Sequence, residues 1–227
     1  PYHRGIFWAW HQHIIDNRSI GEGWTMEGIS YDVVSVRKEV TASYARIEPT
    51  VLWRSSQYFD GKPYIEEKTI IIVYPAEPDI RKIDFEISLK ALVPGVRIGG
   101  ANDEKGYGGF CQRVKLPDGL VFTSSNGPVT PQNTQIKAGP WMDLSGAYGS
   151  DSRVSGITIM CHPSTPNYPA PWILRQKLSM QNIVFPGREP VLIPVDKPVV
   201  LRYRLIIHNG NAGKTDLPGL QSEYERT

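Results

Sequence analysis

The side chains best suited to chemistry gather at the start of the chain. His3, His11 and His13 are three of its five histidines, and Arg4 and Trp8 lie among them. In an extended strand, alternate side chains share a face, so the rings of His11 and His13 are expected on the same side. Two neighbouring imidazoles can bind a metal ion, transfer protons or hold a polar ligand. The plain alternative is a pair of solvated histidines at a strand end.

The pair also forms half of a metal-binding pattern. Gly5, five residues and then His-x-His match the opening of the cupin signature, whose histidines bind iron, manganese or zinc. The glutamate expected three or four residues later is missing, because Glu22 comes too late. A divalent metal site would therefore rest on His11 and His13. The candidates for a third ligand are Glu22, His162 and His208.

Two arginine-bearing stretches suit an oxygen-rich ligand. In His3-Arg4-Gly5, an imidazole stands beside a guanidinium, a combination that can bind anionic or hydroxyl-rich groups. The glycine-rich run from Gly106 to Arg113 lacks the lysine of a phosphate loop, and Arg113 could face a site. An arginine paired with a carboxylate is the plain alternative for Arg4.

A proline-stiffened loop follows Cys161. Four prolines fall between residues 163 and 171, and the loop region carries His162, Trp172 and Arg175. A rigid loop loses little entropy when it binds a ligand, and aromatic faces can stack on sugar rings. The alternative is a structural loop whose Trp172 packs in the core.

Composition excludes several classes of protein. The net charge of +2 comes from 25 basic and 23 acidic residues that are interspersed, so no basic tract predicts nucleic-acid binding. No apolar run approaches the roughly 20 residues of a membrane helix. Cys111 and Cys161 could form one bridge, although two buried thiols are favoured. The chain begins with Pro1, so we expect a piece of a longer polypeptide with any signal peptide upstream; the compartment stays open.

Strands are predicted throughout. Gly 21 and Pro 19 indicate many turns, and Ile83 to Leu89 alternate between apolar and polar residues as a half-buried antiparallel strand does. Asp60-Gly61 and Asp118-Gly119 predict hairpins, and a short helical turn is expected near residues 171–176. The predicted strands cover residues 30–38, 42–55, 64–74, 80–92, 110–116, 120–124, 141–145, 154–162, 180–185 and 199–208.

These elements predict an all-β fold. Many strands separated by Gly/Pro turns favour a large antiparallel β-sandwich, and a galactose-mutarotase-like supersandwich fits the length and turn density. One domain is expected over residues 1–211. The polar residues 212–227 are expected to form a loosely attached tail.

Five pieces of the chain together resemble a bacterial family labelled "methane oxygenase PmoA". They are Tyr2 to Trp10, Tyr107 to Phe110, Trp141 to Gly146, His162 to Pro166 with Pro171-Trp172, and Tyr203 to His208. The label names a membrane enzyme, whereas the resemblance implies a soluble β-rich domain of the kind found beside sugar-degrading enzymes. By this resemblance His3, Arg4, Gly5 and the His162 loop are the expected site, and N-terminal strands of the family are expected to be missing here.

The leading functional hypothesis is a carbohydrate-active protein that works on a sugar or glycoside. Histidines would serve as acid and base in an epimerase, lyase or hydrolase reaction. The proton-transfer candidates are His3, His11, His13 and His162, which should converge in one pocket. The expected ligand-binding residues are Arg4, Trp8, Arg113, Trp172 and Arg175. A non-catalytic carbohydrate-binding module and a cupin-like metal enzyme are the alternatives, and the oligomeric state is left open.

Overall fold

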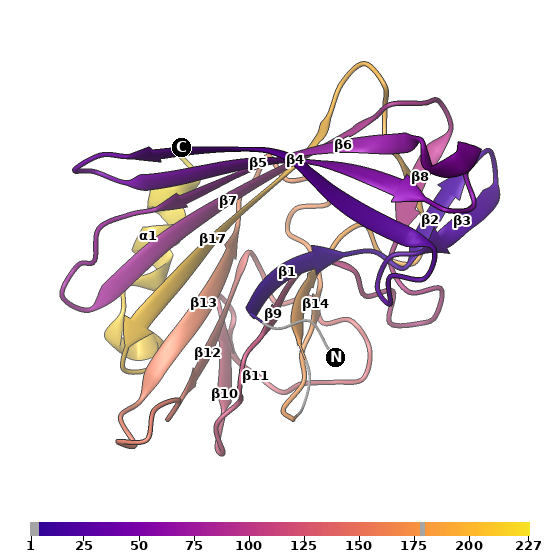
Figure 1. The fold of residues 1–227 in the computed structure, drawn as a ribbon. Coiled ribbons are helices and arrows are strands. Elements are labelled where there is room, and N and C mark those ends of the chain that lie inside the picture. The colour runs from indigo at the N-terminus through magenta and orange to yellow at the C-terminus, as the bar shows by residue number, and fades with distance from the viewer. Residues whose placement is uncertain (1–4, 178–179) are drawn as a thin grey trace.

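The chain folds into antiparallel β-sheets, as predicted (Figure 1). The structure is a computed structural model and describes residues 5–177 and 180–227. Most predicted strands are present within one or two residues of their expected bounds. In the described part, no helix is long and apolar enough to cross a membrane. The expectation of an all-β protein with large antiparallel sheets is confirmed.

The largest sheet has nine strands in the order β11-β10-β12-β13-β17-β7-β6-β5-β4. Phe85, Ile87 and Leu89 of β7 are buried on its inner face, as their alternation predicted. Along the chain its strands are β4 (Ile29–Val40), β5 (Ala45–Ser55), β6 (Pro63–Val73), β7 (Ile80–Ala91), β10 (Val121–Ser124), β11 (Gly127–Val129), β12 (Trp141–Gly146), β13 (Ser155–Cys161) and β17 (Val199–Asn209).

Two four-stranded sheets pack against that inner face. One has the order β1-β9-β15-β14 and lies opposite the large sheet, while β16-β8-β2-β3 lies towards one end (Figure 1). Trp10, Phe110 and Val96 join residues of the large sheet in one core, so the three sheets form a sandwich. Their strands are β1 (Gly5–Ala9), β2 (Gln12–Ile15), β3 (Arg18–Glu22), β8 (Val96–Gly99), β9 (Gly109–Arg113), β14 (Trp172–Ile173), β15 (Gln181–Val184) and β16 (Val191–Leu192).

The C-terminal segment packs on the opposite face of the large sheet, so the expectation of a loose tail is corrected. After a turn of 3-10 helix (Ala212–Lys214), α1 (Leu217–Tyr224) buries Leu217 and Tyr224 against Trp141 and Ile206. Leu217 and Tyr224 lie seven residues apart, which puts them on one side of a helix. Asp216 caps the helix by accepting a hydrogen bond from the backbone N–H of Gly219.

Two local predictions are wrong, because each strand pairs with segments that lie far away in the sequence. The runs on either side of Asp118-Gly119 do not form a hairpin, since β9 pairs with β1 and β15 whereas β10 pairs with β11 and β12. Residues 172–173 form strand β14 rather than a helical turn. The prediction of two buried thiols is confirmed, since Cys111 and Cys161 are both free and buried.

Candidate functional site

A polar cleft opens where the hairpin of β2 and β3 meets neighbouring loops. Its volume is about 450 Å³. Residues from one end of the β16-β8-β2-β3 sheet form most of its lining, and the loops at residues 57 and 102 complete it. The lining residues are His11, Gln12, Ser19, Gly21, Glu22, Glu27, Gln57 and Asn102. Amide, hydroxyl and carboxylate groups therefore surround a space large enough for a small ligand.

His11 and Glu22 form a hydrogen-bonded pair at this cleft. Their Nδ1 and Oε1 atoms are 3.0 Å apart, and the side chains are 18% and 29% exposed. A carboxylate only accepts hydrogen bonds, so Nδ1 carries the proton and Nε2 of neutral His11 holds the lone pair. That Nε2 atom is buried and has no hydrogen-bond partner in the described part of the chain. Burial lowers the pKa of His11, although Glu22 and Asp103 oppose the shift, so a neutral ring is favoured near pH 7.

Glu22 is held in place by the turn that follows it. Its Oε1 accepts from the backbone N–H of Trp24 at 2.8 Å, and its Oε2 accepts from that of Thr25 at 2.9 Å. The Thr25 hydroxyl also donates to Oε2. Glu22 ends β3 opposite Gln12 of β2, which brings the carboxylate beside His11. The carboxylate is therefore fixed before any ligand arrives, as an orienting partner of a catalytic base must be.

Aromatic rings hold the His11 imidazole. Trp24 stacks on it at 5.0 Å and 10°, and Tyr107 meets it edge-on at 4.6 Å and 88°. Burial raises the pKa of Tyr107, and the carboxylates of Asp103 and Glu22 raise it further. Because Trp24 and Tyr107 also contact each other, the ring has little freedom to turn.

The predicted His-x-His pair does not act as a pair. His13 is fully buried, with Nδ1 2.7 Å from the Tyr64 hydroxyl and Nε2 3.2 Å from the Trp10 carbonyl oxygen. Burial lowers its pKa to about 4. His11 lies at the cleft while His13 lies beneath it, so sequence spacing alone did not predict their different surroundings.

Gly23 allows the turn after Glu22 to pack closely against the buried His13 ring. A Cβ atom at residue 23 would lie 2.2 Å from His13 Nε2 and 2.7 Å from the Tyr31 hydroxyl. Both groups are packed in the interior, so the turn itself would have to move.

We therefore expect Gly23→Ala to displace Glu22 and weaken ligand binding in the cleft by at least about tenfold, as a shift of about 1 Å at a site can do. Saturation-transfer NMR with a bound sugar measures the loss. Gly61→Ala is the control, because Gly61 has a positive φ but open space around it and lies outside the cleft. Equal binding by the Gly23 variant and the parent would contradict this role.

The metal hypothesis finds no support in the geometry. No three His, Cys, Asp or Glu side chains among the described residues are arranged to hold a metal ion. Both ring nitrogens of His13 already have partners, so it cannot complete a site with His11 and Glu22. His208 pairs with Asp143 at 2.7 Å, and both are completely buried.

The structure separates His162 from His11, so the expected convergence of four histidines is corrected. His162 contacts the ring of Tyr224 in α1 and receives a hydrogen bond from Ser164 at 2.7 Å. Figure 1 shows α1 and the β2–β3 hairpin at opposite sides of the molecule. The proline-rich loop thus anchors the C-terminal helix. His3 and Arg4 lie outside the described residues.

Of the two predicted stacking platforms, Trp172 is a core residue and Trp8 packs half-buried against the core. Trp172 is fully buried and donates to the Gly139 carbonyl oxygen at 3.0 Å. Trp8 faces inward, where its indole N–H donates to Glu67 at 3.1 Å. Glu67 is itself buried and also accepts from Trp53 and Thr69. Trp172 therefore presents no open face to a sugar, whereas Trp8 is half-buried and its role in binding stays a prediction.

The predicted arginines have mixed positions. Arg175 donates to the backbone carbonyl oxygens of Gln132, Leu174 and Asn133, so it ties loops together. Its positive charge nevertheless acts on Tyr107, where it counteracts the rise in the pKa of that side chain. Arg113 ends β9 opposite Gly5 and lies near the Cys111 thiol. Their roles in binding stay predictions.

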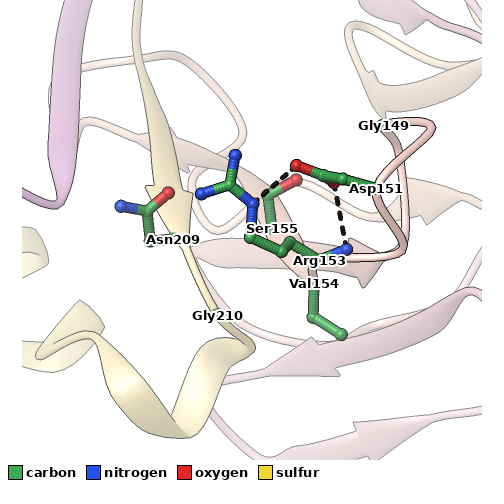
Figure 2. A pocket seen from close by; sticks show the side chains of 7 residues that line it. All are labelled: Gly149, Asp151, Arg153, Val154, Ser155, Asn209 and Gly210. Carbon is green, nitrogen blue, oxygen red and sulfur yellow. Dashed lines mark hydrogen bonds and ion pairs between the residues drawn. The ribbon is translucent and has the colours of Figure 1, made fainter.

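A second hollow of about 590 Å³ lies between the loop at residues 149–154 and the end of β17 (Figure 2). Figure 2 shows the Arg153 side chain turned towards Asp151, with 2.6 Å between Nε and Oδ2. Arg153 is 87% exposed, and the two charges neutralise each other. Because the lining of this hollow contains no histidine and no buried charge, the cleft at His11 is the better candidate site.

Several cleft residues were not predicted from the sequence. They are Gln12, Ser19, Glu27, Gln57 and Asn102. Each is a common polar residue in a turn or at a strand end, and none belongs to a recognisable motif. The one available signal was their closeness in sequence to His11 and Glu22, which applies only to Gln12, Ser19 and Glu27.

Comparison with known proteins adds a family and a distant structural likeness. The model of a family described as of unknown function matches residues 1–221. No curated protein matches the chain. A solved structure described as "Putative kojibiose phosphorylase from human microbiome" is similar at a TM-score of 0.48 and 10% identity, over 98% of this chain and 26% of that one. The chain thus spans about a quarter of that protein.

Proposed function

Because the chain belongs to DUF6807, a family of unknown function, we propose its function from the cleft itself: it binds a sugar or glycoside there and uses His11 as a general base. The observation that carries this proposal is the His11–Glu22 pair, whose 3.0 Å contact leaves a lone pair on Nε2 of a ring that lines a polar cleft. Nε2 is buried, so the proposal requires the cover over this atom to open when the ligand binds. A base held by a carboxylate is a recurring arrangement for proton transfer.

The proposed reaction moves one proton between the ligand and the His11 ring. Nε2 of His11 would accept the proton from the carbon beside the carbonyl group of an open-chain sugar, the electron pair would move onto the carbonyl oxygen as an enediolate, and the Glu22 carboxylate would stabilise the imidazolium. The same ring can return the proton to the adjacent, former carbonyl carbon, which completes an isomerisation. A leaving group on the carbon on the other side would instead depart with its bonding electrons, which is an elimination, whereas an epimerisation would need a second proton donor on the opposite face of the ligand.

The cleft lining also suits a sugar. Gln57, Asn102 and Ser19 offer both donors and acceptors, which hydroxyl groups need when they leave water. The Gln12 side chain is only partly available to a ligand, because its amide N–H groups already donate to the carbonyl oxygens of Gly100 and Arg188. The lining is therefore partly fixed and partly available to a ligand.

The proposal is tested by binding and isotope exchange. Methyl glycosides and free hexoses are incubated with the protein in D₂O, and binding of both is followed by saturation-transfer NMR. Exchange at carbon is followed by loss of proton signal for the free hexoses, because only their open-chain form has an acidic C–H beside a carbonyl group. We expect the wild type to bind and exchange, His11→Gln to lose exchange by at least about a hundredfold, and Glu22→Gln to lose about tenfold or more. His162→Gln is the matched control and should resemble the wild type.

Three outcomes separate the alternatives. Binding without exchange identifies a non-catalytic carbohydrate-binding module. Because Trp172 is fully buried, hydrogen bonds from the cleft lining would be its main contacts. Loss of exchange in His162→Gln but not in His11→Gln would move the site to the proline-rich loop. No binding by any sugar overturns the proposal.

A further inference from the structure

The charge of the cleft has a consequence for the ligand, and it rests on the proposed function. We propose that the cleft selects uncharged sugars and rejects sugar acids, and that Glu27 is the residue that sets this selectivity. The lining contains the carboxylates of Glu22 and Glu27 and no lysine or arginine. Asp103 is also close enough to act on His11, although Lys105 lies 4.0 Å from its carboxylate and offsets part of this charge.

The two glutamates differ in what they can do for a ligand. Glu22 already receives donors on both oxygens, from His11, Trp24 and Thr25. The carboxylate of Glu27 has no hydrogen-bond or ion-pair partner within residues 5–177 and 180–227. It is exposed, so its charge acts through the solvent-filled cleft.

The backbone places both side chains at the same opening. Glu22 and Glu27 exchange two backbone hydrogen bonds, each 2.9 Å, in an isolated antiparallel bridge. Residues directly opposite in such a pair project to the same side. A ligand beside the His11–Glu22 pair therefore approaches Glu27 as well.

The nearby cations do not compensate for these carboxylates. Arg188 donates from Nε to the Asn102 side-chain oxygen at 3.1 Å, and Arg175 is bound to carbonyl oxygens. Neither residue lines the cleft. His11 is favoured as the neutral ring near pH 7, because burial lowers its pKa. A ligand carboxylate would therefore meet like charge without a matching donor.

The test compares sugars that differ only at one group. Methyl glucoside, methyl glucuronide and glucosamine, with the corresponding galactose set, are titrated at pH 7 by saturation-transfer NMR. We expect the neutral glycosides to bind about tenfold more tightly than the uronates at low salt, and the gap to narrow as salt screens the charges. Glucosamine should bind at least as well as the neutral sugar.

Glu27→Gln assigns the effect to one residue. The variant is expected to reduce the ratio of the affinities for neutral sugar and uronate to about threefold. Glu39→Gln, the same change at the far end of β4, should leave this ratio unchanged. Uronates that bind as tightly as neutral sugars overturn the selectivity and leave the proposed function standing. An unchanged gap in Glu27→Gln overturns the role of this residue. No binding of any sugar overturns both.

Discussion

Arg204→Met is expected to destabilise the protein by about 3–5 kcal/mol, the cost of leaving a buried charge without its partner. Arg204 is 2% exposed, and its Nε and Nη2 atoms lie 2.6 and 2.9 Å from the two oxygens of Asp84. It also contacts Glu223 of α1 at 3.1 Å and lies over the ring of Tyr224 at 4.5 Å. The substitution would therefore leave Asp84 without its cationic partner and weaken the packing of the C-terminal helix. Equilibrium unfolding in urea measures the loss.

The chain supplies a closely matched control two residues away. Arg202 pairs with Glu86 at 2.8 Å on the same two strands, β17 and β7, in the same cross-strand register. The two side chains are 38% and 34% exposed, so water screens the pair. Arg202→Met should cost less than about 1 kcal/mol. Equal losses in the two variants would show that burial does not decide the strength of these pairs.

Acid is expected to destabilise the native protein through His13. Burial lowers its pKa to about 4, whereas an unfolded histidine titrates near 6.5. Between these values the unfolded chain binds the proton and the native state does not, so stability falls as the pH falls. At pH 5 the loss attributable to His13 is about 2 kcal/mol relative to pH 8, where both states leave the ring neutral.

His13→Gln isolates this contribution. Burial also lowers the pKa values of His11 and His162, so all three histidines make the wild type less stable in acid. The variant is less stable at neutral pH, because Tyr64 or Trp10 loses a partner, but its stability should fall less steeply below pH 6.5. Urea unfolding at half-unit pH steps gives both curves. Identical slopes would contradict a buried, neutral His13.

The sequence predicted individual strands well and their partners poorly. The alternation at Ile83 to Leu89 marked β7 because side-chain direction in a strand depends only on neighbouring residues. The separation of β9 from β10 into different sheets could not be predicted, since each choice depends on strands far away in the chain. The short helix α1 was missed because its apolar contacts are few and lie beneath polar residues.

For the site, residue types were predicted and their arrangement was not. His11 was a candidate for both proton transfer and metal binding and Glu22 for metal binding, but their hydrogen-bonded pairing was not predicted. The β2–β3 hairpin places Gln12 opposite Glu22, and that register makes the His11–Glu22 contact. His162 and Trp172 have the chemistry that a sugar site needs, yet the first packs on α1 and the second fills the core.

By itself the sequence determined an all-β chain with buried thiols and most of its strands, because alternation and turn residues act locally. Only the tertiary structure decided which histidine meets a carboxylate at an open cleft. His11 and His13 are two residues apart, yet one lies at the cleft and the other is sealed beneath it. That difference comes from burial and from the donors and acceptors that distant strands bring, which spacing along the chain does not encode.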